Sequence, residues 1–364
     1  MAEKTGKRKV DHIRICLDQK AQAKNVTAGF EDIQLVHRAL PEINKAKISL
    51  STTFLGKKFN APVIVGSMTG GAKEAIQINA SIAEAVEQLG LGMGLGSQRA
   101  AIENEKLEIT YNIARKKAPN AFLIANVGGV QLVHGYGLKE VKKIVEMIDA
   151  DAVAIHLNAL QEAVQPEGQT NFQGVLAKIA EIAGAIDTPV IVKETGAGIS
   201  AEDAEALENA GVKAIDIGGL GGTSFAAVEY YRSTAHEDVY LGEAFWDWGI
   251  PTAVSLIENA QSVKLPLIAS GGVRSGTDIA KALGLGASLA SISQPILETA
   301  AKGKMETIEK LNCLIEELRN VLFLVSAERI ADLAKTPLVI TGKTAQWLQA
   351  RGFNLKKYAK RGAQ

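Results

Sequence analysis

The chain has 364 residues, of which 47% are hydrophobic and 22% charged, so it can bury the core of one large α/β domain or of two smaller ones. Its 40 Lys and Arg balance its 40 Asp and Glu, which excludes the basic footprint of a nucleic-acid-binding protein or of one that binds anionic membranes. This composition also excludes intrinsic disorder and a small disulfide scaffold.

The N-terminal residues 1–20 are basic, but charged side chains interrupt them before an apolar run can form, so we expect no signal peptide. Cys16 and Cys313 lie too far apart for a zinc site or a redox pair, and the longest uncharged stretch, residues 118–138, is too rich in Gly and Asn to cross a membrane. A cytoplasmic protein is therefore predicted. The basic run has two interpretations: a solvated tail, or a segment that folds over a site and clamps a diphosphate with Arg8 and Arg99.

From residue 61 onward, short β-rich apolar runs alternate with helical stretches at a spacing of about 30 residues. The eight runs are Pro62–Gly66, Leu91–Gly96, Phe122–Val127, Ala152–Leu157, Val190–Glu194, Ala214–Gly218, Leu267–Gly271 and Ser288–Ile292. Such alternation requires parallel pairing with right-handed crossovers, and eight repeats close a TIM (β/α)8 barrel. We expect residues 1–60 to form an N-terminal basic segment, 61–297 the barrel, and 298–364 extra C-terminal helices that pack on it.

Two capping boxes, at residues 200–203 and 275–278, predict helix starts after strands five and seven. An amphipathic stretch from Met305 to Ala331 is expected on the outside of the barrel. The long segment from Gly219 to Trp248, between strand six and its helix, is expected to be an active-site loop.

The carboxyl ends of the predicted strands are polar and rich in glycine, and a barrel of this kind builds its site there. Gly271-Gly272-Val273-Arg274 follows strand seven and Ala290-Ser291 ends strand eight, which is where such barrels bind a phosphate. The alternative is that these glycines only make tight turns.

Lys193 lies in a strand that otherwise reads Val-Ile-Val, so its ammonium needs a partner at the barrel mouth. Three roles remain open: a Schiff-base lysine, an ion-pair partner of Glu194, or a cation that faces an anionic ring. After strand four, the segment HLNALQEAVQPEG at 156–168 holds His156 and Glu162, and a single carboxylate suits Mg²⁺.

The chain resembles the type 2 isopentenyl-diphosphate isomerases in a set of motifs. They are Arg8-Lys9 with His12, SMTGG at 67–71, GSQR at 96–99, NVG at 126–128, HLNALQEAVQPEG at 156–168, KETGAGIS at 193–200, GGTSFAAVEYYR at 221–232 and SGGVRSG at 270–276. That family consists of FMN-dependent TIM barrels that interconvert isopentenyl and dimethylallyl diphosphate with Mg²⁺. The resemblance covers residues 8–297.

The resemblance implies roles for individual residues. Flavin contacts fall on Ser67, Met68, Thr69, Ser97, Asn126, Lys193, Thr223, Gly271, Gly272, Val273, Arg274, Ala290 and Ser291. Substrate contacts fall on Arg8, Lys9, His12, Ser97, Arg99 and His156, with Asn158 and Gln161 near the reacting carbons and Glu162 on Mg²⁺. Many members have Trp where this chain has Phe225, and Gly where it has Ser291.

The chemistry so implied moves a double bond by adding a proton at one end of an allyl unit and removing one at the other. Reduced FMN, without net redox change, would stabilise the positive charge between these steps and shuttle a proton at N5. Lys193 would stabilise the anionic reduced flavin, and Gln161 would relay a proton. NADH or NADPH would supply the reducing equivalents, and a homo-oligomer, either a tetramer or an octamer, is expected.

Two other functions stay open. One is an FMN-dependent oxidoreductase of the hydroxy-acid oxidase or dihydroorotate dehydrogenase type, for which His236 is the only spare base and neither cysteine is expected on a mouth loop. The other is a flavin-binding barrel without turnover, which would have no use for Glu162 beside Gln161.

Overall fold

The computed structural model describes residues 2–18, 21–233 and 235–362, with side chains from Arg8 onward. Eight parallel strands close a barrel in the order β10-β11-β4-β5-β6-β7-β8-β9, which confirms the predicted TIM barrel. The barrel strands are β4 (Val63–Val65), β5 (Gly92–Gly94), β6 (Phe122–Gly128), β7 (Ala152–Leu157), β8 (Val190–Glu194), β9 (Ala214–Asp216), β10 (Leu267–Ala269) and β11 (Leu289–Ile292). Each overlaps one predicted run.

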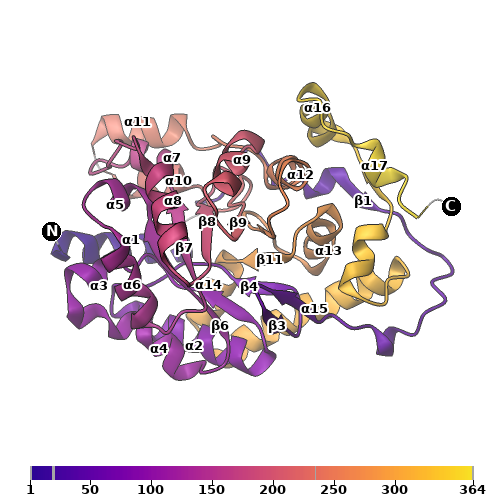
Figure 1. Ribbon diagram of the computed structural model, residues 1–364, viewed down its shortest axis with the longest axis horizontal. Helices are drawn as coiled ribbons and strands as arrows, with labels where there is room; N and C mark the ends of the chain where they lie inside the picture. Colours follow the sequence, from indigo (N-terminus) through magenta and orange to yellow (C-terminus); the bar gives the residue numbers. More distant parts are fainter. Residues whose placement is uncertain (1, 19–20, 234, 363–364) are drawn as a thin grey trace.

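Helices connect the strands and cover the outside of the barrel (Figure 1). They are α2 (Glu74–Leu89), α3 (Arg99–Glu103), α4 (Ile109–Lys117), α5 (Gly129–Val133), α6 (Leu138–Met147), α7 (Ala159–Val164), α8 (Val175–Ala185), α9 (Ala201–Asn209), α12 (Thr252–Ser262), α13 (Gly276–Leu285) and α14 (Gln294–Ala300). Both predicted helix starts are confirmed, because the Ser200 and Ser275 hydroxyls each accept the backbone N–H three residues on, at 3.1 Å. The reciprocal bond of a capping box, from the N-cap N–H to the aspartate, is present at Ser275 and not at Ser200 among the described contacts.

A hairpin of β2 (Thr52–Phe54) and β3 (Lys57–Phe59) closes the amino-terminal end of the barrel. Phe54 and Phe59 are buried and stack edge-on and tilted against Phe122, with ring centroids 5.9 and 5.6 Å away. Leu55 and Gly56 turn the hairpin with φ of +45° and +82°, the backbone of a two-residue turn that matches strand twist. The N-terminal segment before the barrel thus contains more regular structure than its polar sequence indicates.

The segments outside the barrel meet each other. The strand β1 (Ile33–Leu35) pairs antiparallel with β12 (Leu338–Ile340), with Gln34 opposite Val339. The helix α15 (Lys304–Leu324) buries Leu311, Leu314 and Leu318, in agreement with the predicted amphipathic stretch. Beyond it, α16 (Gly342–Ala350) and α17 (Lys356–Ala359) lie at one end of the long axis, while α1 (Ala2–Asp18) lies at the other (Figure 1).

The segment from Gly219 to Trp248 was expected to be a loop and is instead largely helical. It contains α10 (Phe225–Arg232) and α11 (His236–Ala244), and Ser224 caps α10 by accepting the Ala227 N–H at 3.2 Å. Trp246 packs with Ile15, Ala227 and Val228, so α1 packs against α10. Among the described residues, no helix combines the length and the hydropathy needed to cross a membrane.

Candidate active site

A cavity of about 260 Å³ opens at the carboxyl ends of the barrel strands, and α1 and α10 contribute to its wall. Of the predicted site residues, those that line it are Arg8, Lys9, His12, Ser67, Met68, Thr69, Ser97, Arg99, Asn126, His156, Asn158, Gln161, Glu162, Lys193, Thr223, Gly271, Gly272, Val273, Arg274 and Ser291. Because Arg8, Lys9 and His12 reach the cavity, the solvated-tail interpretation does not hold for them.

Ala290 is the predicted site residue that the structure does not bring to the cavity. Successive side chains on a strand point to opposite faces. Leu289 packs inside the barrel and Ser291 lines the cavity, whereas the Ala290 methyl packs in the layer between strands and helices. Ser291 is almost fully buried, with 3% of its surface exposed.

The loop after β10 has the form of a phosphate cradle. Gly271 and Gly272 have φ of +96° and +70°, and a Cβ on Gly271 would lie 2.0 Å from the carbonyl oxygen of Gly219. Glycine is therefore required there for a close turn, which also precedes the N-terminus of α13. The Arg274 guanidinium contacts the side chains of Gln22 and Gln294, so it spans from the N-terminal segment to α14.

Lys193 projects from β8 into the cavity with 9% of its surface exposed, and its Nζ donates to the backbone oxygen of Glu194 at 2.7 Å. The Glu194 carboxylate instead accepts the backbone N–H groups of Thr195, Gly196 and Ala197 at 2.5–2.6 Å. The predicted alternative of a Lys193–Glu194 ion pair is therefore wrong, since no such pair exists among the described residues. Lys193 remains a cation that faces the cavity.

His156 is held as a neutral ring. Its Nδ1 lies 2.7 Å from Asn126 Oδ1, and because the Asn126 amide group donates to Leu95 O, Nδ1 is the donor of this bond. Burial, followed by the positive charge of Lys193, lowers the pKa of His156 to about 3. Its Nε2 therefore presents a lone pair and must gain a proton to bind an anion.

The Glu162 carboxylate is buried among amides. It accepts Asn158 Nδ2 at 3.0 Å, Gln165 Nε2 at 2.6 Å and the Gln169 N–H at 2.7 Å. Two buried amide oxygens on its neighbours, Asn158 Oδ1 and Gln165 Oε1, have no hydrogen-bond partner in the part of the chain that the structure describes. Among the described residues no three His, Cys, Asp or Glu cluster as metal ligands. One carboxylate with two unpaired oxygens is an oxygen-only donor set of the kind that suits Mg²⁺ with water and phosphate oxygens completing the shell.

Lys9 is the buried cation of α1. Its Nζ donates to the backbone oxygen of Ser97 at 2.9 Å. Burial, and then the charges of Arg8 and Arg99, lower the pKa of Lys9 from 10.5 to about 7. A cluster of cations around one cavity is an arrangement that a bound anion stabilises.

A chain of ion pairs joins α1 to α10 and to the loop after α7. On α1, His12 Nε2 lies 3.0 Å from Glu229 Oε1 and Arg8 lies 3.8 Å from Glu167. Arg232 links the two carboxylates, because it lies 2.6 Å from Glu229 and 2.7 Å from Glu167. We call these five residues the α1 ring.

Several cavity residues were missed from sequence. They are Ile13, Cys16, Gln131, Gln165, Asp216, Ser270, Ser293 and Gln294, together with Phe225, which was noted only as a departure from the family. Cys16 corrects the expectation that neither cysteine reaches the mouth, although burial raises the pKa of its thiol to about 12. His236, the base that an oxidoreductase would have used, lies on α11 and does not line the cavity. Gln165 could have been found, because it stands one helical turn after Glu162.

The chain matches the family model of FMN-dependent dehydrogenases over residues 1–122 and 142–340. It is 51% identical over 359 residues to the isopentenyl-diphosphate delta-isomerase of Methanosarcina mazei, with 98% of each chain covered. It is 51% identical to that of Methanothermobacter thermautotrophicus, with 97% of this chain and 99% of the relative covered. For Pyrococcus abyssi the identity is 50% and the coverage 98% of each.

Solved structures share the fold. A putative lactate oxidase of Pediococcus acidilactici matches with a TM-score of 0.65 at 18% identity, covering 94% of this chain and 93% of its own. A mandelate oxidase matches with a TM-score of 0.62 at 16% identity, covering 93% of this chain and 99% of its own. At identities this low, the similarities establish the barrel fold only. The reaction must be argued from the residues of the site.

Proposed function

This chain belongs to the isopentenyl-diphosphate delta-isomerases of the FMN-dependent type 2 kind, and from that premise we propose how its residues perform the reaction. The activity is the interconversion of isopentenyl and dimethylallyl diphosphate in isoprenoid biosynthesis. The single observation that carries this function is the identity of about half the residues over nearly the whole chain with several such isomerases.

The diphosphate is bound by the cations of α1 and their neighbours. Lys9 and Arg99 both line the cavity, and Arg8 and His12 stand beside them on the inner face of α1. Guanidinium groups bind phosphate oxygens through two parallel donors, and a buried ammonium adds a point charge. His156 joins them once the anion has raised its affinity for a proton, so substrate binding and proton uptake are coupled.

The oxygen cluster around Glu162 would hold Mg²⁺. The ligands are the Glu162 carboxylate and the unpaired oxygens Asn158 Oδ1 and Gln165 Oε1. Mg²⁺ held by these residues would supply positive charge that neutralises part of the charge of a diphosphate. The amide donors that now saturate Glu162 hold its carboxylate in place for that role.

The remaining wall suits FMN. The glycine turn at Gly271 and Gly272 and the N-terminus of α13 would take its phosphate, and Lys193 would face its ring system. Further contacts are proposed for Ser67, Met68, Thr69, Ser97, Asn126, Thr223, Val273, Arg274 and Ser291. When bound, reduced FMN would supply an electron-rich ring able to stabilise a carbocation-like state without net oxidation. Lys193 would offer a fixed positive charge that favours the anionic form of this ring.

Gln161 and Asn158 position the reacting end of the substrate. Asn158 Nδ2 donates to Gln161 Oε1 at 3.2 Å, so the two amides orient each other at the start of α7. An amide is too weak a base to remove an allylic proton alone, and Gln161 therefore relays a proton that another group supplies. Phe225 and α1 cover this part of the cavity and exclude water from a reactive cation.

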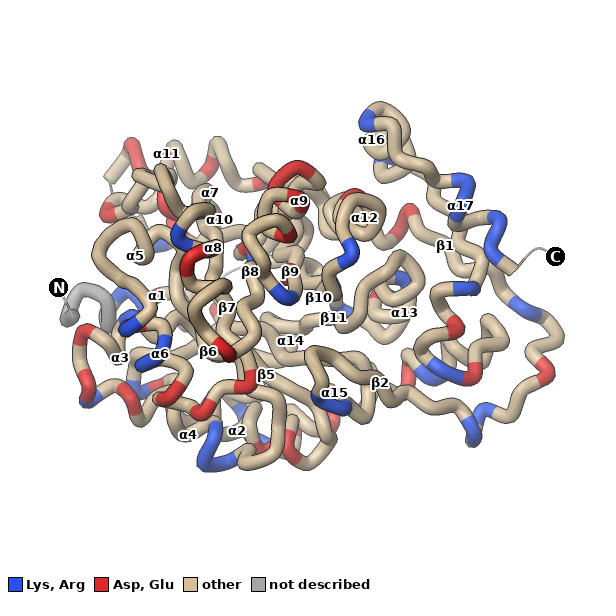
Figure 2. The backbone as a smooth tube through the Cα atoms, viewed as in Figure 1, with Lys and Arg blue, Asp and Glu red and all other residues tan. Residues whose placement is uncertain are grey.

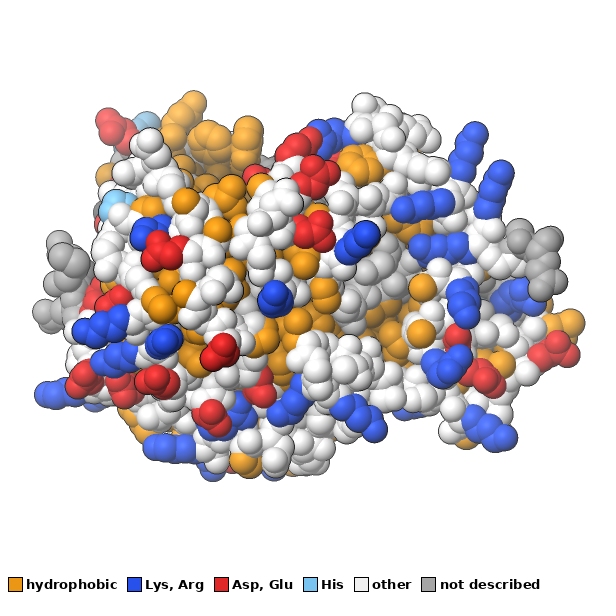
Figure 3. All heavy atoms as spheres, in the orientation of Figure 1, with side chains coloured by type: hydrophobic (Ala, Val, Ile, Leu, Met, Phe, Trp, Pro, Cys, Tyr) orange, Lys and Arg blue, Asp and Glu red, His pale blue; other side chains and the backbone are white. Residues whose placement is uncertain are grey.

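Two further parts of the proposal concern partners. NADH or NADPH would reduce the flavin. A homo-oligomer, a tetramer or an octamer, would cover an apolar surface over α10 and α11, where Figure 3 shows hydrophobic side chains together. That surface exposes Tyr231, Tyr240, Leu241 and Trp248 to 39%, 65%, 37% and 62%. The division into residues 1–60, 61–297 and 298–364 belongs to the same proposal, with the reaction in the barrel.

The experiment that tests this function counts product against reductant. Anaerobic protein with FMN, Mg²⁺ and isopentenyl diphosphate is expected to be inert while the flavin is oxidised and active after reduction with dithionite or NADPH. Product should then greatly exceed the reductant consumed, with deuterium from solvent in the allylic positions. One product per reductant would instead establish an oxidoreductase.

A further inference from the structure

A second recess lies at the opposite end of the barrel from the active site. It has a volume of about 370 Å³ and is formed where the chain enters β10 and β11, against α17. The residues that line it are Ala260, Val263, Lys264, Leu265, Pro266, Leu267, Leu285, Gly286, Ser288, Lys357, Tyr358 and Arg361. None of them lines the active-site cavity.

The C-terminal segment of the chain carries charge of one sign only. Residues 333–364 contain seven Lys and Arg and no Asp or Glu, although the whole chain has a net charge of zero. Figure 2 shows these basic residues along α16, α17 and the segment that joins them, and Figure 3 shows Lys and Arg gathered on the surface there. A local excess of one sign of charge attracts counter-ions of the other.

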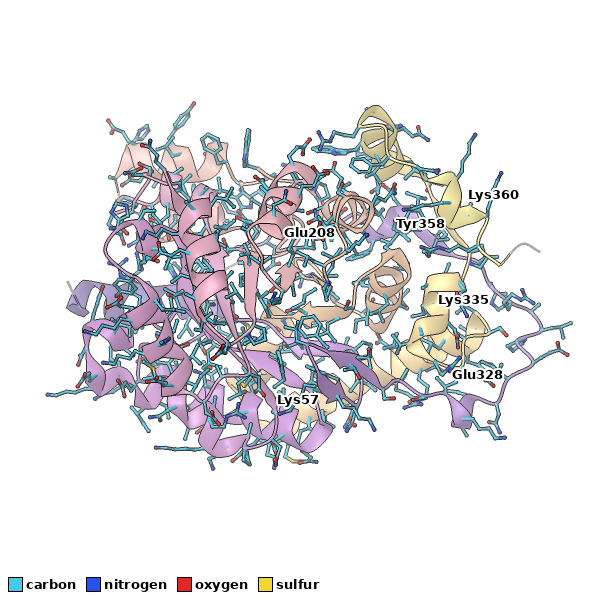
Figure 4. The ribbon with its side chains drawn as sticks, viewed as in Figure 1. Lys57, Glu208, Glu328, Lys335, Tyr358 and Lys360 are labelled. Atoms are coloured by element: carbon cyan, nitrogen blue, oxygen red, sulfur yellow. The ribbon has the colours of Figure 1, made fainter. Side chains whose placement is uncertain are left out.

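Two of the cations are gathered around one aromatic ring. Tyr358 is buried, and its ring lies 4.5 Å from the Arg361 guanidinium carbon and 5.3 Å from Lys357 Nζ. Arg361 is anchored, because its Nη1 donates to Gly284 O at 2.5 Å. Figure 4 shows Tyr358 turned toward α13 and Lys360, directly after the end of α17, pointing to solvent.

These cations lack anionic partners. Among the described residues, no carboxylate forms an ion pair with Lys264, Lys357 or Arg361. The carboxylate of Glu208 accepts the backbone N–H of Lys264 at 2.8 Å, but it does not line the recess. Burial, and then the charge of Arg361, lower the pKa of Lys357, which shows that the two cations repel each other across a partly dry surface.

Apolar residues also line the recess, although polar groups make up most of the surface exposed in it. Val263, Leu265 and Pro266 are half-buried and Leu285 is buried. A ligand that satisfies both parts carries an anionic group with several oxygens and a short apolar portion. The guanidinium of Arg361 and the ammonium groups of Lys357 and Lys264 match a phosphate or diphosphate in this position.

We propose that this recess is a second binding site, separate from the catalytic one, for a small phosphate- or diphosphate-bearing molecule with a short apolar group. The phosphate lies against Arg361, Lys357 and Lys264, and the apolar group lies against Leu265, Pro266 and Leu285. Since the site is at the far end of the barrel, its occupation does not require the active site to be free.

Calorimetric titration of the FMN-loaded protein with inorganic pyrophosphate tests the proposal. Two sites per chain are expected, of which Lys9→Gln weakens only the catalytic one. The variant Lys357→Gln should weaken only the second, by about tenfold, the effect of losing one hydrogen bond to a charged group. Lys360→Gln, which changes an exposed lysine directly after the end of α17, is the matched control and should keep both sites.

The double variant Lys357→Gln/Arg361→Gln removes two of the cations of the second site. Because Arg361 also holds α17 to the barrel, the melting temperature of this variant is measured first. If the melting temperature is lower than that of the wild-type protein, the single variant Lys357→Gln decides the result. One site in the wild-type protein, or two undiminished sites in Lys357→Gln, would overturn the proposal. Butyl phosphate is expected to bind the second site more tightly than inorganic phosphate, and equal affinities would refute the apolar part. Binding to vesicles with anionic lipid in the absence of a second pyrophosphate site would also overturn it in favour of a membrane contact.

Discussion

His12 Nε2 lies 3.0 Å from Oε1 of Glu229, a residue 217 positions away whose side chain is fully buried. Burial alone would raise the pKa of Glu229, but the hydrogen bond from His12 and the charge of Arg232 outweigh it and hold this pKa below its usual value. The buried carboxylate is therefore an anion with two partners, and one of them belongs to α1. The position of the diphosphate-binding helix thus depends on α10.

Arg232 is the residue on which the α1 ring depends, since it contacts both Glu229 and Glu167. Arg232→Gln should leave Glu229 with a single partner and free Glu167 from α10, so α1 is held less firmly. We expect the KM for isopentenyl diphosphate to rise about tenfold and the free energy of unfolding to fall by ~1–3 kcal/mol, as for a broken charged hydrogen bond. Steady-state kinetics and denaturant unfolding measure both quantities.

The matched control removes an ion pair of similar length far from the site. Lys178 and Glu181 lie 2.6 Å apart on the exposed face of α8, and Lys178→Gln should change neither KM nor stability by a measurable amount. Unchanged KM in Arg232→Gln, with FMN affinity also unchanged, would mean that the ring does not position α1.

Lys9 gives the substrate affinity a pH dependence. With a pKa of about 7, the Lys9 side chain is a charged ammonium below pH 7 and progressively loses this charge above it. Proton uptake by His156 already makes KM rise with pH below 7, and because the diphosphate binds the charged form of Lys9, the rise should steepen above pH 7 by up to a further tenfold per pH unit. Initial rates between pH 6 and 9 measure this profile. Lys9→Arg keeps its charge throughout and should flatten the rise, and an identical slope in both proteins would assign the titration to another group.

The barrel could be predicted from sequence because each strand is a short apolar run bounded by polar or glycine residues, and the pattern repeats eight times. The β2–β3 hairpin could not, since Lys57 and Lys58 make its second strand look like a polar loop. Its stability comes from Phe54 and Phe59, which bury their rings on Phe122, a residue far along the chain. The prediction of a loop from Gly219 to Trp248 was wrong for a similar reason. The helices of this segment are stabilised by contacts with α1, which is distant in the sequence.

Most of the site could be located because strand ends converge at the mouth of a barrel. Ala290 does not line the cavity, because Ala290 and Ser291 are neighbours on one strand and their side chains point to opposite faces. Asp216 was missed although it stands as a lone carboxyl in a predicted apolar strand, where Ser270 donates to its Oδ1. That donor comes from a neighbouring strand, and the α1 ring likewise joins side chains whose proximity only the folded chain determines.

Glu162 is the carboxylate of the proposed metal site. Glu162→Gln places an amide group where three amide donors now point and removes the charge that Mg²⁺ requires. We expect kcat to fall at least 100-fold, with the visible spectrum of bound FMN unchanged. Titration of the activity with Mg²⁺ and of the apoprotein with FMN separates the two effects. If the variant lost FMN binding to the same extent as activity, the role of Glu162 would be structural instead.

Lys193 should control the electronic state of the flavin more than its binding. Its Nζ is fixed by Glu194 O at 2.7 Å and has no carboxylate within ion-pair distance among the described residues, so its charge is directed into the cavity. Lys193→Met removes that charge, which should destabilise the anionic reduced ring and make the two-electron reduction potential of bound FMN more negative by tens of millivolts, at about 30 mV per tenfold change in equilibrium constant. Dye equilibration measures the potential, and the absorbance of reduced flavin reports its protonation. Lys193→Arg retains the charge and should stay within about 15 mV of the wild-type potential. If the methionine variant kept both the wild-type potential and the anionic spectrum, Lys193 would have to act on the substrate and not on the flavin.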